Sequence, residues 1–274
     1  MSTVERASMS KDSAGSKPLV KLIAFSAPVR GGDPRRLAIL AIKVSQGRLH
    51  EKSYEHYLTA YSNERVSEWL RISYAFPSVL EHIVFTFLIE DISRVCSHQL
   101  VRHRIASYTQ ESQRYSESYA RRALRKIESL LKERGVAIDK RSRARVIEQF
   151  LEIASPVEIV EAASEAFVIP KHLGKELASE IARSYLQALA EYYRLVDSGA
   201  KPEDARFILP QAIKTRILMT VNLRELLHIA CLRLSTKAQW EIREVVKKMI
   251  EEVERVVPEV KQMLRAMCRE EVEL

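Results

Sequence analysis

A dense cluster of arginine and hydrogen-bonding side chains over residues 102–115 is the sequence feature that most constrains this chain. Three arginines and one histidine fall between positions 102 and 114, and only Glu111 offsets their charge. Like charges this close repel each other, so a fold keeps them together only when an anion lies among them. Because arginine binds phosphate through a planar, bidentate fork and stays charged when partly buried, the cluster predicts a site for a phosphorylated ligand.

A solvent-exposed basic helix face is the alternative interpretation of this cluster, since runs of charge usually face water. Arg102, His103 and Arg104 are consecutive, however, and consecutive residues on a helix point about 100° apart. The three side chains would therefore wrap around a helix. This arrangement suits a helix end that closes on a ligand better than one solvated face.

The cluster resembles the signature of the flavin-dependent thymidylate synthases, which is Arg-His-Arg, seven residues and then serine. Here the seven residues are 105–111, the serine is Ser112, and the string continues as Gln113-Arg114-Tyr115. Other segments match the same family in order and spacing, so that the resemblance covers the chain from about residue 35 to residue 242. These segments are residues 78–87, 97–101, 205–210, 220–224, 232–233 and 238–241.

The resemblance implies reductive methylation of dUMP to dTMP, with FAD as cofactor, methylenetetrahydrofolate as carbon donor and NADPH as reductant. It also implies a homotetramer whose active sites are each built by more than one subunit. The implied FAD set is Ser78, Arg102, His103, Arg104, Gln110, Asn222, Arg224 and His228. The implied dUMP set is Gln99, Arg102, Gln110, Glu111, Ser112, Gln113, Arg114, Arg206 and Arg233.

The physical chemistry of these residues agrees with the implied ligands. FAD carries a pyrophosphate and dUMP a phosphate, so the arginines have negative charge to neutralise. Asn222 and Glu225 have the spacing of a helix capping box, which would place Arg224 at a helix N-terminus, where anions bind. The sequence lacks a Gly-x-Gly-x-x-Gly loop, so FAD would not bind here through a Rossmann turn.

Arg233 is the predicted catalytic residue, because its charge would polarise the uracil ring and stabilise the charge that develops at N3. Ser112 is a candidate nucleophile, but no pair of histidine and carboxylate is evident near it in sequence, so it is assigned to substrate binding. Structural roles remain the alternative for several residues of the match. They are His82, which would be a hydrogen-bonding residue, His228, Gln239 and Trp240, which would be helix residues, and Arg206, which would pair with Glu203.

The cysteines Cys96, Cys231 and Cys268 are odd in number, widely spaced and without a Cys-x-x-Cys motif. This pattern argues against a disulfide framework and a zinc site, and it favours a reducing, cytoplasmic location. None of the three lies in an arginine-rich context that would favour a thiolate, which disfavours the cysteine-dependent route of the folate-only thymidylate synthases. We expect no bound metal.

Residues 1–17 are rich in serine, lysine and alanine and predict a disordered lead-in rather than a signal peptide. No apolar run in the chain approaches the roughly 20 residues of a membrane span, so no membrane partner is expected.

Most of the net charge of +8 comes from residues 121–145, which contain ten basic and three acidic side chains, a balance of +7. Such a segment is compatible with nucleic-acid binding, but it lacks interleaved aromatic residues and a recognised motif. A solvent-exposed surface helix is the preferred interpretation. A nucleic-acid-binding protein is the competing one, and it predicts salt-dependent binding and no flavin.

Hydrophobic patterning predicts an α+β fold, or an irregular α/β fold, because strands and helices mix without a regular βαβ alternation. The expected architecture is a central mixed or antiparallel sheet flanked by long helices, in a single catalytic domain over residues 18–274. Strands are predicted over residues 19–24, 82–89 and 215–221. Helices are predicted over 35–44, 54–74, 91–100, 119–133, 141–153, 158–167, 174–196, 222–232 and 239–256, with Asp91 and Asn222 as N-caps.

The sequence departs from the family at two places. Family members usually carry a histidine two residues before Ser78, where this chain has Phe76, so its site is expected to be gated differently. A member that keeps FAD but has lost activity is a third interpretation. The stretch between Arg114 and Arg206 is also longer than in compact members and contains a basic helical insertion at about 119–172, which we interpret as a peripheral subdomain for assembly.

Overall fold

The computed structural model describes residues 17–139, 141–268 and 272, which form two compact units. The sheet unit comprises Pro18–Ser112 and Lys214–Leu274, and the helical unit contains Gln113–Ile213. The sequence analysis treated residues 18–274 as one domain with an insertion at about 119–172, and that insertion falls within the helical unit. The lead-in predicted over residues 1–17 lies outside the described residues except for Lys17.

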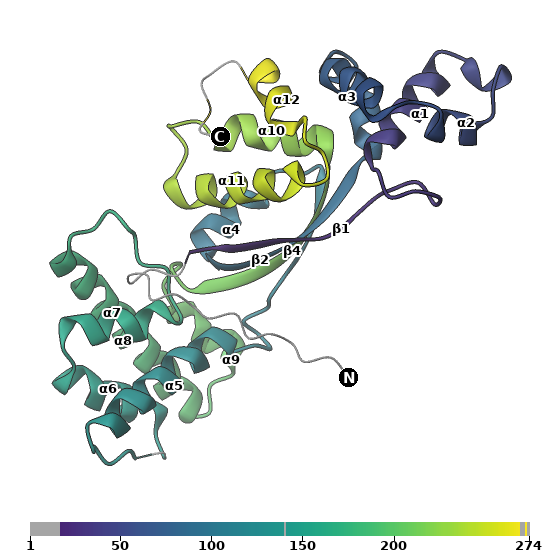
Figure 1. Cartoon of the computed structure of the whole chain (residues 1–274). Helices are drawn as coiled ribbons and strands as arrows, with labels where there is room; N and C mark the ends of the chain where they lie inside the picture. The colour runs from purple at the N-terminus through teal and green to yellow at the C-terminus, as the bar shows by residue number, and fades with distance from the viewer. Residues whose placement is uncertain (1–16, 140, 269–271, 273–274) are drawn as a thin grey trace. The chain divides into compact units, whose positions relative to one another are not determined.

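In the described part of the chain, four antiparallel strands form a sheet in the order β1-β2-β4-β3, of which β1, β2 and β4 are labelled in Figure 1. The strands are β1 (Leu19–Phe25), β2 (Val84–Ser93), β3 (Ala106–Gln110) and β4 (Lys214–Asn222). An antiparallel sheet with helices was one of the predicted arrangements. Strand β3 was not predicted, because its sequence is mostly polar and lacks the alternation of apolar and polar residues that marks a half-buried strand.

The helices of the sheet unit are α1 (Arg35–Ser45), α2 (Tyr54–Thr59), α3 (Asn63–Ile72), α4 (Arg94–Leu100), α10 (Leu223–Arg233), α11 (Trp240–Glu254) and α12 (Val260–Met267), with the 3-10 helices η1 (Arg48–His50), η2 (Ser73–Ala75) and η3 (Pro77–His82). The single helix predicted over 54–74 is wrong, because α2 and α3 each begin after a serine. The hydroxyls of Ser53 and Ser62 accept from the backbone N–H three residues later. Helix α12 was not predicted.

Helix α4 begins after Ser93 and not at Asp91, as the sequence analysis predicted. Strand β2 continues through residue 93, and Asp91 takes a positive φ of 59°, a conformation that aspartate tolerates better than most residues. The Ser93 hydroxyl accepts from the backbone N–H of Cys96 at 3.0 Å and donates to the carboxylate of Glu241 at 2.6 Å. The start of α4 is therefore anchored to α11.

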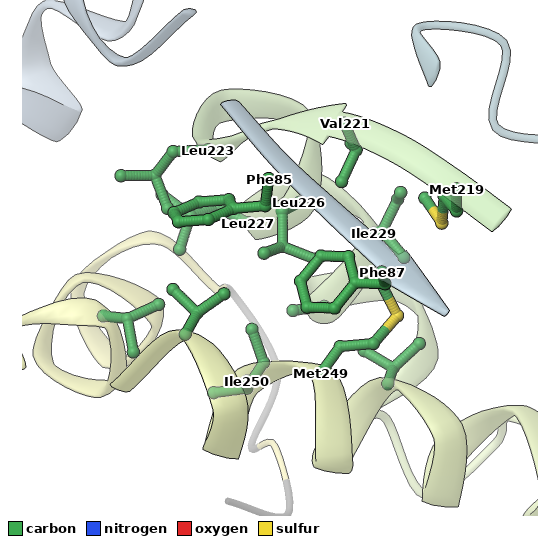
Figure 2. Packing of buried hydrophobic residues seen from close by; sticks show 14 of the residues in the cluster. Phe85, Phe87, Met219, Val221, Leu223, Leu226, Leu227, Ile229, Met249 and Ile250 are labelled. Atoms are coloured by element: carbon green, nitrogen blue, oxygen red, sulfur yellow. The ribbon is translucent and has the colours of Figure 1, made fainter. Parts of the chain in front are cut away.

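One continuous apolar core joins a face of the sheet to α10 and α11. Figure 2 shows Phe85 and Phe87 of β2 among side chains of these helices, including Leu226 and Met249. Both phenylalanines are fully buried, as the alternation over residues 82–89 predicted. The core fixes the position of α10, the helix that carries several predicted site residues.

The helical unit consists of α5 (Ser118–Glu133), α6 (Arg143–Ile153), α7 (Pro156–Ser164), α8 (Lys175–Asp197), α9 (Pro202–Ala205) and the 3-10 helix η4 (Arg206–Ile208). Its helices bury apolar faces in a second core that includes Phe150 and Tyr193. Basic side chains on the other faces form ion pairs, such as Arg134 with Glu158. The longer helices match the predicted ones to within a few residues. No helix in the described residues of the chain is long and apolar enough to cross a membrane.

Cys231 and Cys268 form a disulfide bond, which corrects the prediction that the cysteines do not pair. The odd number hid this pair, because the third cysteine, Cys96, is buried as a free thiol and the two partners are 37 residues apart. The bond ties the end of α12 to α10. It also removes the argument for a reducing location that was based on cysteine usage.

Replacing Cys231 and Cys268 with serine is expected to lower the free energy of unfolding by about 3–4 kcal/mol, because the unfolded chain gains the entropy of a loop of this length. The denaturant midpoint of the double variant, measured with and without a phosphine reductant, checks this. Reductant should lower the midpoint of the parent protein and leave the variant unchanged. A parent protein that is indifferent to reductant under conditions that reduce the bond would contradict the prediction.

Candidate functional site

Helix α10 begins at the N-cap that the sequence predicted. The side-chain oxygen of Asn222 accepts a hydrogen bond from the backbone N–H of Glu225 at 2.9 Å. Arg224 lies in the first turn of the helix, and its guanidinium forms an ion pair with Glu81 of η3. The positive end of the helix dipole and an arginine are therefore adjacent, which favours a negatively charged ligand.

Adjacent cavities lie along α10 in the sheet unit. One, of about 490 Å³, is lined by residues that include Glu81, Ile105, Asn222, Arg224, Glu225 and His228. Another, of about 760 Å³, is lined by residues that include His228, Cys231, Arg233, Ser235, Lys237 and Cys268. Because His228 and Met267 line both cavities, the surface is continuous from the N-terminus of α10 to Arg233. We call this surface the α10 cleft.

Arg102, His103 and Arg104 lie in the turn between α4 and β3, at the helix end where the sequence analysis placed them. Both arginines are exposed, whereas His103 is only 6% exposed. The hydroxyl of Tyr108 on β3 lies 2.9 Å from the backbone carbonyls of Leu100 and of His103 and donates to them. Tyr108 therefore holds the turn in place. Arg102 and Arg104 of the turn are exposed to solvent, and His103 between them is buried.

His103 links this turn to α10. Its Nε2 accepts a hydrogen bond from Nε of Arg233 at 3.1 Å, and its Nδ1 lies 3.9 Å from Oε1 of Glu225. Arg233 also donates through Nη2 to the backbone carbonyl of Gln99 at 3.4 Å. Burial, reinforced by the nearby Arg233 and His228, lowers the pKa of His103 to about 4. His103 is therefore neutral at neutral pH.

The lowered pKa of His103 predicts that the protein loses stability as the pH falls from about 6.5 to about 4. A histidine in the unfolded chain takes up its proton near pH 6.5, whereas folded His103 does so only near pH 4. Between these two pH values the unfolded chain binds more protons than the folded chain, so the free energy of unfolding falls as the pH falls. The contribution of neutral His103 to stability is fully present only above about pH 6.5. The variant His103→Gln should show a flatter profile of denaturation midpoint against pH. An equally steep profile in that variant would contradict the assignment to His103.

Glu225 is a feature of the site that the sequence analysis treated only as part of a helix cap. Its side chain is buried, and burial raises its pKa, although the charges of His228 and Arg224 act in the opposite direction. The carboxylate lies next to His103. The sequence signal that could have identified Glu225 was its place as a lone acidic residue on a helix that also carries Arg224, His228 and Arg233.

The residues of the implied dUMP set fall in both units. Gln99, Arg102, Gln110, Glu111, Ser112 and Arg233 belong to the sheet unit, whereas Gln113, Arg114 and Arg206 belong to the helical unit. In the sheet unit, Gln110 donates through Nε2 to the hydroxyls of Ser97 at 3.0 Å and Thr215 at 3.2 Å. The carboxylate of Glu111 lies 3.3 Å from the guanidinium of Arg216. Gln110 and Glu111 are therefore held by neighbouring side chains.

Arg114 and Arg206 meet at Glu203 in the helical unit. Arg114 forms an ion pair with the Glu203 carboxylate at 2.8 Å. Arg206 instead donates through Nε to the backbone carbonyl of Glu203 at 3.1 Å. The side-chain pair that the spacing of Arg206 and Glu203 suggested is thus a contact with the main chain, and the carboxylate pairs with Arg114.

Ser78 of η3 lines other cavities than the α10 cleft. One of them, of about 490 Å³, is also lined by Trp69 and Phe76. Phe76 is 64% exposed, so the position where the sequence comparison expected histidine presents an apolar ring. The implied FAD set is therefore divided within one chain. His103 is buried, Arg102 and Arg104 are exposed, Asn222, Arg224 and His228 line the α10 cleft, and Ser78 lies elsewhere.

The donors along the α10 cleft fit an organic ligand that carries negative charge and hydrogen-bonding groups. Arg224 and Arg233 supply positive charge, Asn222 and His228 supply polar groups, and the helix N-terminus adds its dipole. Within the part of the chain that the structure describes, no group of three or more His, Cys, Asp or Glu side chains is placed to hold a metal ion.

Comparison with known proteins gives consistent matches. Residues 27–259 match the family model described as thymidylate synthase complementing protein. The flavin-dependent thymidylate synthase of Aeropyrum pernix is 39% identical over 264 residues, which cover 91% of this chain and 78% of that protein. The enzyme of the same name from Sulfurisphaera tokodaii is 33% identical over 251 residues, with the same coverage.

Solved structures share the fold. The crystal structure of thymidylate synthase X from Helicobacter pylori with FAD and dUMP has a TM-score of 0.63 and 20% identity, and the match covers 93% of this chain and all of that one. A UMP/dUMP methylase from Streptomyces cacaoi bound with 5-Br dUMP has a TM-score of 0.62 and 23% identity, with coverage of 93% and 97%. At these identities the structural likeness concerns the fold.

Proposed function

Because the chain belongs to the flavin-dependent thymidylate synthases, we propose that it binds FAD and converts dUMP to dTMP by reductive methylation. Methylenetetrahydrofolate is the proposed carbon donor and NADPH the proposed reductant. The family resemblance inferred from residues 102–115 is confirmed by the family match and by the curated relatives. The observation that carries the proposal is the placement of Arg233 on the same cleft as Asn222, Arg224 and His228.

The proposed FAD site uses Asn222, Arg224 and His228 along the α10 cleft, with Arg102 and Arg104 in the adjacent turn. The arginines would neutralise the pyrophosphate in place of a glycine-rich loop. Arg224 is paired with Glu81, so binding requires the phosphate to share or displace that carboxylate. Ser78, His103 and Gln110 complete the proposed set. Of these, His103 and Gln110 are bonded to other side chains and would act mainly by holding the turn and the strand in place.

The proposed dUMP site comprises Gln99, Arg102, Gln110, Glu111, Ser112, Gln113, Arg114, Arg206 and Arg233. We also propose that the site is completed by neighbouring subunits of a homotetramer. One observation within the sheet unit supports this: Ser78 lines other cavities than Arg224 does. Assembly would bring together groups that line separate cavities of one chain.

Arg233 has the central chemical role in the proposed mechanism. Its guanidinium stabilises the negative charge that develops at N3 of the uracil ring, and its bond to His103 holds it in one orientation before the reaction begins. FAD, when bound and reduced, supplies the hydride.

No cysteine is available as an enzyme nucleophile. Burial raises the pKa of the Cys96 thiol well above its usual value, and Cys231 and Cys268 are joined in a disulfide. Ser112 is proposed to bind substrate, as the sequence analysis assigned it, and the reaction is proposed to proceed without an enzyme nucleophile.

The visible absorption spectrum of the purified protein tests the proposal. After FAD is added and unbound flavin is removed, the protein should keep a flavin spectrum, and dUMP should shift that spectrum because both ligands occupy one site. Formation of dTMP with methylenetetrahydrofolate and NADPH should follow. A protein that retains no flavin, and instead binds DNA or RNA with a steep dependence on salt, would favour the nucleic-acid alternative.

A further inference from the structure

We propose that Glu225 is a positioning residue, which sets the orientation of Arg233 through His103. The inference rests on the proposed function for the role of Arg233 in the reaction. It adds a residue outside both implied binding sets, and it assigns His103 the role of a link between a carboxylate and the catalytic guanidinium.

The hydrogen bond between Arg233 and His103 determines where the histidine carries its proton. Nε of Arg233 can only donate, so Nε2 of His103 must present its lone pair at 3.1 Å. In neutral His103, the proton is then on Nδ1. Oε1 of Glu225 lies 3.9 Å from that nitrogen, so the carboxylate faces the N–H that the bond to Arg233 creates.

At both ends of this arrangement, the backbone is held by a neighbouring side chain. Glu225 is held in the first turn of α10 by the bond from its N–H to Asn222. His103 is held by the hydroxyl of Tyr108, which donates to its carbonyl. Because His103 is buried between two positions of one helix, a small rotation of its ring would move the acceptor away from Arg233.

The charge of Glu225, which lies beside Nδ1 of His103, strengthens the hydrogen bond that Nε2 of the same ring accepts from Arg233. A carboxylate near Nδ1–H stabilises that tautomer and makes Nε2 a better acceptor, which is the role that carboxylates play behind histidines in metal sites and catalytic triads. Arg233 is thereby held by two acceptors, His103 and the carbonyl of Gln99. Arg233 also lines the α10 cleft.

A purely structural role for Glu225 makes a different prediction. The bond from its backbone N–H to Asn222 does not depend on its side chain, and glutamine or leucine would keep it. If the carboxylate of Glu225 only stabilised the helix N-terminus, replacing it would lower the stability of the protein. The replacement would not change the turnover of correctly folded, flavin-loaded enzyme or the proton position on His103.

Two variants of Glu225 test the proposal against a control on the same unit. Glu225→Gln removes the charge at constant size, and Glu225→Leu also removes the acceptor. The control, Glu251→Leu, changes an exposed glutamate of α11. At matched flavin content, kcat should fall by about 10- to 100-fold in the Glu225 variants, more in leucine than in glutamine, with little change in the KM for dUMP. An unchanged kcat in both variants would overturn the proposal.

The proton position on His103 gives a readout that needs no turnover. Solid-state ¹⁵N NMR of protein labelled at histidine should show a bare Nε2 for His103, with its signals identified by their loss in His103→Gln. Glu225→Leu should shift this population towards the Nε2–H tautomer. A His103 that carries its proton on Nε2 in the parent protein would overturn the proposal, whereas the expected tautomer in a protein without dTMP synthesis would contradict the proposed function and the catalytic role together.

Discussion

Replacing Arg233 with alanine is expected to reduce kcat for dTMP formation by about 10²- to 10³-fold while FAD remains bound. The proposed role of Arg233 is to stabilise charge that develops on the uracil ring, so the loss should fall on the chemical step. FAD retention is expected because Arg233 lies at the end of the α10 cleft away from Asn222 and Arg224. Flavin absorbance per chain and steady-state kinetics with dUMP measure the two effects separately.

The variant Arg233→Lys separates charge from geometry. Lysine keeps the positive charge but lacks the planar guanidinium, which donates to His103 and to the carbonyl of Gln99 at the same time. The lysine variant should therefore recover little activity. Arg255→Ala is the matched control, because the side chain of Arg255 is 73% exposed and forms an ion pair with Glu252 near the end of α11. Robust turnover in Arg233→Ala would exclude the proposed mechanism.

Local signals allowed much of the site to be predicted from the sequence. The run from Arg102 to Arg104 was placed at a helix end because three consecutive side chains cannot share one helix face. Asn222 was identified as an N-cap from residue type and spacing alone, and the structure confirms its hydrogen bond. Both predictions depend on contacts between residues close in sequence, where spacing determines geometry.

The parts that were missed depend on contacts between residues far apart in sequence. Glu225 and His103 are separated by more than a hundred positions, and nothing in either local pattern indicates that they meet. The disulfide between Cys231 and Cys268 likewise follows from the return of α12 to α10. Strand β3 forms because β4 offers it a free edge, although its own sequence lacks the pattern of a strand.

Asp91 illustrates a local signal that tertiary structure overrides. Aspartate before an apolar stripe is a reasonable N-cap, but Ser93 takes that place because its hydroxyl bonds both the helix and Glu241. The sequence analysis expected a helical insertion at about 119–172 but did not indicate the bounds of the helical unit. The helices of residues 113–213 bury a separate core, and amphipathic patterns do not say which helices share one.

Replacing Phe87 with alanine is expected to lower the free energy of unfolding by about 3–5 kcal/mol. The ring is fully buried between the sheet and the helices α10 and α11, so its removal forfeits apolar burial and leaves a cavity (Figure 2). Chemical denaturation followed by far-UV circular dichroism measures the loss.

The matched control for Phe87→Ala is Phe207→Ala, which removes the same side chain from a position that is 84% exposed. This change should stay within about 0.5 kcal/mol of the parent protein, because the phenylalanine ring is already largely in water. Equal losses in the two variants would show that the core around Phe87 does not carry the stability of the sheet unit. A large loss at Phe87 alone would show that the core joining β2 to α10 and α11 carries much of the stability of the sheet unit.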